Sequence, residues 1–122
     1  DVYKRQEIYS VIENFKEVKE SIVVGQKWDN DVRIILFVVM SKSYSLNDDI
    51  ILRLKKRIRS EASPRHVPSK IIQVSDIPRT KNGKIVELAV KNTIEGSKIK
   101  NVQALANPNV LNEFKNLKQL KF

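Results

Sequence analysis

The sequence contains no cysteine and only one histidine, His66. The absence of thiols excludes disulfides, a thiolate nucleophile, iron–sulfur clusters and zinc sites built on cysteine. A single imidazole also excludes a histidine-rich metal site, so we expect no metal ligands in this chain. A chain without cysteine is compatible with a reducing compartment, and we expect a cytoplasmic protein.

The chain also lacks a long apolar run. Its longest stretch extends from Ile34 to Met40, whereas a membrane-spanning helix needs ~20 apolar residues. The N-terminus, Asp1–Arg5, shows none of the apolar run that a signal peptide requires. We therefore expect no membrane span and no membrane partner.

The composition is that of one folded domain with an excess of positive charge. Its 122 residues are 41% hydrophobic and 30% charged, which fits a single globular unit. Lysine and arginine number 23 and aspartate and glutamate 14, which gives a net charge of +9. A basic domain attracts nucleic acid, acidic lipid or phosphorylated small molecules, and charge alone does not choose among them.

Apolar spacing predicts helices and strands in the order α-β-β-α-β-α-α. Helices with one apolar stripe are expected over residues 8–15, 45–58, 86–94 and 107–117. Strands are expected over residues 21–25, 33–41 and 71–74, with the first two joined as an antiparallel hairpin by a loop at 27–31. The run at 33–41 is rich in β-branched residues and does not alternate, which indicates a central strand buried on both faces. The order predicts a small α+β domain, with helices that flank a three-stranded core sheet.

Polar residues mark two expected helix starts. Ser45 is placed to cap the second helix, and Asn107 the last one, where Pro108 takes the first helical position. The second helix carries a basic face that ends at Arg59. This face either is solvated and matched to the helix dipole or binds phosphate.

The densest group of candidate functional residues is the heptapeptide Pro78–Lys84. Its Asn82-Gly83 pair is a strong turn signal, because both residues tolerate positive φ. The turn is either a plain hairpin tip with solvated lysines or a loop that holds Lys84 within reach of a phosphate or carboxylate. Lysine suits the second role, because it carries a compact positive charge on a long side chain.

The pattern Pro-x-Thr-x-x-Gly-Lys at 78–84, downstream of the proline-bounded segment Ser63–Pro68, resembles the C-terminal lysine signature of the adenylate-forming acyl-CoA synthetases. Further matches resemble the branch of that family whose acid is acetoacetate: Glu7-Ile8-Tyr9, Leu54–Pro68, Val86-Glu87 and Asn107–Phe122. The resemblance covers residues 7–122. Residues 1–6 do not match, and we expect them to mark a truncation.

The resemblance implies a ligase that works in two steps. A large N-terminal domain binds the acid and ATP, and holds most of the contacts to Mg²⁺. The acid attacks the α-phosphorus of ATP to give an acyl-adenylate and pyrophosphate, and CoA then displaces AMP to give the thioester. Residues 7–122 would be the small C-terminal domain, a mobile lid that rotates between the two steps. The ATP- and acid-binding domain would lie outside this chain.

The resemblance also implies residue roles. Lys84 matches the lysine that bridges the acid carboxylate and the nucleotide, and Gly83 matches the glycine that shapes its turn. Arg59 matches an arginine that contacts the CoA phosphates in related acetyl-CoA synthetases, although a plain helix-end cation is an open alternative. We expect a structural role for His66, for which no partner with a triad or ligand role is apparent, and loop packing for Trp28.

Two other interpretations remain open. The acid could be acetate or propionate, because the acid pocket is expected in the other domain. The chain could instead be a basic nucleic-acid-binding module, which usually needs exposed aromatic side chains for base stacking. Phe15, Phe37 and Phe114 all fall on apolar stripes, so we expect no nucleic-acid partner.

Overall fold

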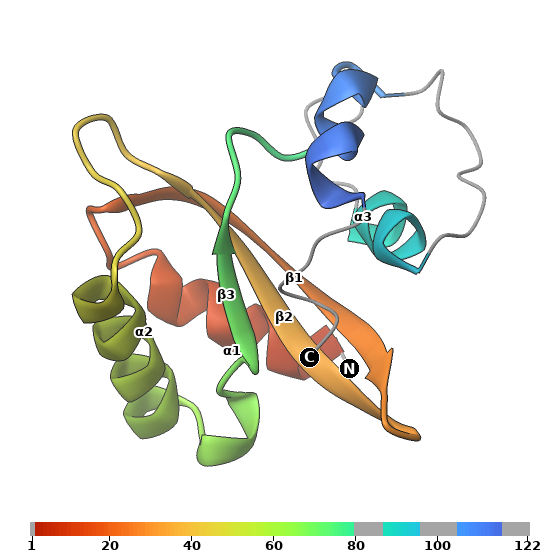
Figure 1. The fold of residues 1–122 in the computed structure, drawn as a ribbon. Helices are drawn as coiled ribbons and strands as arrows, with labels where there is room; N and C mark the ends of the chain where they lie inside the picture. Colours follow the sequence, from red (N-terminus) through yellow and green to blue (C-terminus); the bar gives the residue numbers. More distant parts are fainter. Residues whose placement is uncertain (1, 80–86, 96–104, 116–122) are drawn as a thin grey trace.

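The computed structural model describes residues 2–79, 87–95 and 105–115, which form a three-stranded sheet with helices on both faces (Figure 1). The elements in chain order are α1 (Val2–Ile12), β1 (Val18–Trp28), β2 (Asp31–Met40), α2 (Asp48–Glu61), the 3-10 helix η1 (Pro64–His66), β3 (Lys70–Gln73), α3 (Glu87–Ile94) and the 3-10 helix η3 (Pro108–Phe114). The predicted α+β class and three-stranded core sheet are confirmed.

The sheet has the order β1-β2-β3 and is mixed. β2 pairs antiparallel with β1, as predicted, and parallel with β3. The β1–β2 turn is tighter than the expected loop, since β1 continues to Trp28 and only two residues separate the strands. These residues, Asp29 and Asn30, have φ of 51° and 61°, a conformation that aspartate and asparagine tolerate better than most residues.

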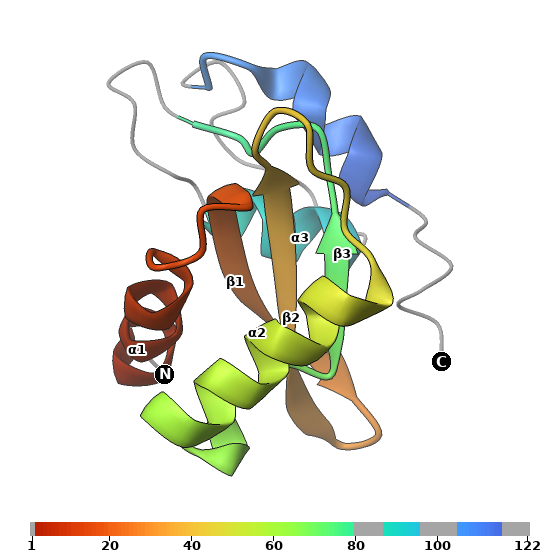
Figure 2. The ribbon, with the colours of Figure 1, turned by 90° about the vertical axis from the view of Figure 1, so that its left-hand side faces the viewer.

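The side chains of β2 alternate between two apolar cores. Leu36 and Val38 face a core that α1 and α2 complete, and Ile35 and Phe37 face a second core that α3 and η3 complete. Figure 2 shows α1 and α2 on one face of the sheet and α3 on the other. Because both faces are covered there, the strand is apolar from Ile34 to Met40, and the prediction of a central strand buried on both faces is confirmed for this part.

Three local predictions were wrong. Helix α1 begins at Val2, well before the first residue of its apolar stripe. The cap of α2 is Asn47 and not Ser45, because Asn47 directly precedes the helix and its side-chain oxygen accepts from the backbone N–H of Ile50 at 2.9 Å. The segment that starts at Pro108 is a 3-10 helix, and Asn107 makes no side-chain capping bond to it.

Within the described parts of the chain, no helix combines the length and the apolar character that a membrane crossing requires.

Candidate functional site

The structure places one of the three residues predicted to bind substrate. Arg59 lies in the last turn of α2, exposed to solvent, and no hydrogen bond or ion pair joins its guanidinium to another described residue. Gly83 and Lys84 fall in the segment 80–86, outside the described residues. The geometry of the site is therefore built from Arg59 and from the residues on either side of that segment.

The rest of the basic face of α2 is partly neutralised. Arg53 contacts Glu17 at 2.7 Å and Asp49 at 3.1 Å, and Arg57 pairs with Glu61. The pKa of the Glu17 carboxyl is lowered by hydrogen bonds, first from the backbone N–H of Glu17 and then from the Arg53 guanidinium. These two arginines already have carboxylate partners, which leaves Arg59 better placed to take a substrate anion.

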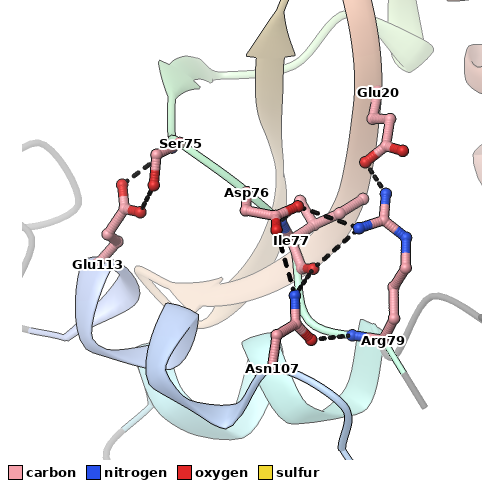
Figure 3. A network of polar contacts seen from close by, with 7 residues as sticks. All are labelled: Glu20, Ser75, Asp76, Ile77, Arg79, Asn107 and Glu113. Carbon is pink, nitrogen blue, oxygen red and sulfur yellow. Dashed lines mark hydrogen bonds and ion pairs between the residues drawn. The ribbon is translucent and has the colours of Figure 1, made fainter. Parts of the chain in front are cut away.

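Arg79, the last described residue before segment 80–86, is held through its side chain. One guanidinium nitrogen, Nη1, donates to Oδ1 of Asp76 at 3.0 Å. The other, Nη2, forms an ion pair with Glu20 of β1 (Figure 3). The guanidinium therefore joins the chain just before segment 80–86 to β1, an edge strand of the sheet.

The backbone of Arg79 is held as well, by the stretch that leads into η3. Its N–H donates to Oδ1 of Asn107 at 2.9 Å, and its carbonyl accepts from the N–H of Ala106 at 2.8 Å. Nδ2 of Asn107 donates to the carbonyl of Ile77 at 2.9 Å and to Asp76 at 3.3 Å (Figure 3). The Asn107 side chain thus binds the chain before Lys84, and this is why it does not cap η3.

A second contact joins η3 to the residues that follow β3. Glu113 accepts hydrogen bonds from the backbone N–H of Ser75, at 3.0 Å, and from the Ser75 hydroxyl. Phe114 packs edge-on against Phe37 of β2, with ring centroids 4.8 Å apart. Polar contacts at both ends of η3 and apolar packing beneath it fix it against the residues that follow β3.

Glu87 opens α3 and directly follows segment 80–86. Its Oε2 accepts from the Tyr9 hydroxyl at 3.0 Å and lies 3.6 Å from Nε of Arg5. The Tyr9 hydroxyl in turn accepts from the backbone N–H of Val23 at 2.8 Å. Burial, more than the nearby carboxylate, raises the pKa of Tyr9, so its hydroxyl stays protonated and continues to donate.

Arg79 and Glu87, the described residues that flank segment 80–86, border one surface pocket of about 590 Å³. Arg79 lines it from one side and Glu87 from the other, and α1 and β1 supply the rest of the wall. The fold therefore brings together the two points between which the chain must carry Gly83 and Lys84. Sequence reasoning missed Arg79, Asn107 and Glu87 as parts of the site, because their partners are distant in the chain.

His66 has two partners that the sequence did not reveal. Its Nε2 lies 2.8 Å from Oε2 of Glu7 in α1, and its Nδ1 contacts the hydroxyl of Ser63. That hydroxyl also accepts from the backbone N–H of Arg65, as a cap of η1. These contacts join η1 to α1.

Trp28 lies at the end of β1 and not in a loop. The guanidinium of Arg33 sits 3.9 Å from the centre of its ring, a cation–π contact between the two strands of the hairpin. Among the described residues, no group of three or more His, Cys, Asp or Glu side chains could hold a metal ion.

Comparison with known proteins adds to this geometry. Residues 7–84 match a family model described as the AMP-binding enzyme C-terminal domain. An acetoacetyl-coenzyme A synthetase of Rhizobium meliloti (strain 1021) is 52% identical over 94% of this chain and 18% of its own length. An acetoacetyl-CoA synthetase of Gallus gallus is 40% identical over 94% of this chain and 17% of its own length.

The structure of an acetoacetyl-CoA synthetase from Streptomyces lividans is similar as well. It matches with a TM-score of 0.82 and 32% identity, over 94% of this chain and 18% of that one. The chain therefore spans less than a fifth of the length of these relatives.

Proposed function

Because this chain belongs to the family of AMP-binding enzyme C-terminal domains, we propose that it is the C-terminal part of an acetoacetyl-CoA synthetase. The observation that carries the proposal is the 52% identity over 94% of the chain, which extends beyond the residues 7–84 matched by the family model. The whole protein would be an acid–thiol ligase with acetoacetate, ATP and CoA as substrates. The partner of this domain would be an N-terminal domain that binds ATP, its Mg²⁺ and the acid.

In the first step a carboxylate oxygen of acetoacetate attacks the α-phosphorus of ATP. A new P–O bond forms, the bond to pyrophosphate breaks, and acetoacetyl-adenylate results. Two anions must approach each other in this step, so a positive charge held between them before the reaction lowers the barrier. Lys84 would supply that charge, and Gly83 would shape the turn that presents it.

In the second step the sulfur of CoA attacks the carbonyl carbon of the adenylate and AMP leaves. The acyl group is already activated, so this step needs no charge from Lys84. Arg59 would instead bind the phosphates of CoA. Its exposed guanidinium, free of partners among the described residues, can offer parallel N–H donors to a phosphate.

The test is acid-dependent exchange of pyrophosphate into ATP by the full-length protein. Acetoacetate should support exchange with a higher kcat/KM than acetate or propionate. A preference for acetate or propionate would assign the protein to another branch of the family. Exchange with none of the three acids would overturn the proposed function.

A further inference from the structure

We propose that the domain carries a binding pocket for a small phosphate monoester with an apolar body, formed around Arg65, Lys91 and Gly25. The pocket has a volume of about 730 Å³ and lies at the end of the sheet nearer the β1–β2 turn. That volume falls within the range of roughly 300–1,000 Å³ that small-molecule sites occupy. The inference goes beyond the proposed function and stands apart from it, because all the groups that it uses belong to described residues of this chain.

The first observation is an excess of positive charge on the walls of the pocket. Four cations and two acids are among its described lining residues. Arg65 lines it from η1 and Lys91 from α3, and no hydrogen bond or ion pair joins either charged group to another described residue. Arg33 adds a third cation, whose guanidinium lies over the ring of Trp28 while its Nε donates to Gln26 at 2.8 Å.

The second observation is that both acids on the walls already have donors. Oε2 of Glu87 accepts from the Tyr9 hydroxyl at 3.0 Å and lies 3.6 Å from Nε of Arg5, the fourth cation. Oδ1 of Asp31 accepts from the backbone N–H of Val32 at 2.8 Å. These contacts occupy the acids, whereas Arg65 and Lys91 have their N–H donors available for an anion.

The third observation is a backbone donor on the outer edge of β1, which has α1 over one face of the sheet and α3 over the other (Figure 2). The N–H of Val23 points away from β2, since it donates to the Tyr9 hydroxyl at 2.8 Å. Backbone direction alternates along a paired strand, so the N–H of Gly25 points to the same outer side. No other described residue accepts from it, and Gly25 lines the pocket without a side chain to cover this N–H.

These groups favour a phosphate monoester over other anions. Like phosphoserine, such a molecule carries a charge of roughly −1.5 to −2 at pH 7 and three strong acceptor oxygens. The charge matches the two unpartnered cations, and the oxygens match their donors and the N–H of Gly25. The walls also contain Val32, Ile34 and Val67, of which Val32 is 61% exposed. Apolar surface beside the cations favours a ligand with an organic body over free inorganic phosphate.

The experiment titrates the 122-residue chain with phenyl phosphate, and the backbone amide signals are followed by NMR. Inorganic phosphate and phenol are the control probes, because the first lacks the apolar body and the second lacks the charge. Arg65→Ala and Lys91→Ala each remove one cation from the pocket. Lys42→Ala is the matched control, since Lys42 is an exposed lysine that lies beyond the far end of β2. Amide signals outside the pocket show that each variant keeps its fold.

We expect phenyl phosphate to shift the Gly25 amide signal saturably, with a Kd at least ~10-fold lower than that of inorganic phosphate. Phenol should leave this signal in place. Arg65→Ala and Lys91→Ala should each raise the Kd for phenyl phosphate by roughly tenfold or more, the size of the loss of one charge-assisted bond. Lys42→Ala should bind as wild type does.

Other outcomes would overturn the inference. A Gly25 signal that does not move, or equal affinities for phenyl phosphate and inorganic phosphate, would show that no such pocket exists. Equal effects of Lys42→Ala and Lys91→Ala would show that only the net charge of the chain attracts the probe. A loss of binding in Arg59→Ala but not in Arg65→Ala or Lys91→Ala would place the probe at Arg59. None of these results affects the proposed function, which is tested separately by pyrophosphate exchange in the full-length protein.

Discussion

One positive charge has its largest effect where two anions must meet, and at the scale of single residues this is the role we assign to Lys84. In the full-length enzyme, Lys84→Ala should cut acetoacetate-dependent ATP–pyrophosphate exchange by at least ~10²-fold, the size of the loss of one preorganised donor. Conversion of acetoacetyl-adenylate and CoA to thioester should survive. Acetylation of Lys84 removes the same charge and should block the first half-reaction only. An equal loss in both half-reactions would make Lys84 a structural residue of the lid.

Arg59 should affect CoA more than ATP. Arg59→Ala removes a charge-assisted contact to phosphate, worth about 1.5–3 kcal/mol, and should raise the apparent KM for CoA by roughly tenfold or more. Lys56→Ala is a suitable control, because Lys56 is an exposed cation of the same helix. Steady-state kinetics with CoA varied provides the measurement. An unchanged KM for CoA together with impaired pyrophosphate exchange would contradict this assignment.

At the scale of elements, hydrogen bonds of the Tyr9 hydroxyl connect α1, β1 and α3. The hydroxyl joins α1 to the outer edge of β1, through Val23, and to the start of α3, through Glu87. Tyr9→Phe should lower the free energy of unfolding by about 1–3 kcal/mol, because the N–H of the buried residue Val23 is left without an acceptor. Urea unfolding of the chain measures the change. Tyr44→Phe, at a position 40% exposed, should change stability little, and an equal effect of the two variants would refute the role of the hydroxyl.

The contact between α2 and the start of β1 should depend on pH. The pKa of Glu17 is lowered from 4.5 by its hydrogen bonds, so the folded state binds its proton less readily than the unfolded state does. The stabilisation is therefore present above about pH 4.5 and lost as the pH falls through the lower pKa of the folded state. Glu17→Gln should flatten the decline of the urea midpoint over this acid range. The same substitution at the exposed Glu13 should leave the decline as it is in wild type, and an unchanged decline in Glu17→Gln would contradict the prediction.

Several elements could be predicted from local pattern, and the error at Asn107 has a cause that local pattern cannot reveal. The run at 33–41 identified β2, because the part of a strand that is covered on both faces, here Ile35–Met40, must be apolar on both. The stripe of Ile50, Leu54 and Ile58 identified the buried face of α2. Asn107 was misread as a cap, since its side chain is satisfied by residues 76–79, which lie 28 to 31 positions upstream. Local spacing carries no information about such a contact.

The residues of the candidate site also fall into two groups, those that a local motif indicates and those that only the tertiary fold brings in. Lys84, Gly83 and Arg59 could be proposed from the sequence because they belong to motifs that can be compared with a known family. Arg79 stood within the same motif and was passed over, because nothing in the order of residues reveals that Glu20 lies beside it. The supporting residues of a site are set by the tertiary fold, and only a structure can show them.

At the scale of the whole molecule, the described parts contain the means to fold but only part of the means to react. Two apolar cores, one on each face of the sheet, are completed by elements of this chain itself. No polar side-chain atom buried within the described ranges lacks a hydrogen-bond partner. A domain with complete cores and satisfied polar groups meets the main physical requirements for independent folding.

We therefore expect the isolated chain to fold cooperatively and to be catalytically inert. Circular dichroism should show a single thermal transition, because the two cores share β2 and should unfold together. With acetoacetate, ATP, Mg²⁺ and CoA supplied, the chain should form no AMP above background, since under the proposed function Lys84 and Arg59 would only assist substrates that another domain binds. The full-length enzyme, assayed in parallel, serves as the positive control. Acetoacetate-dependent AMP formation by the purified chain would show that the reaction centre lies within these 122 residues and that the division of labour between the two domains is wrong.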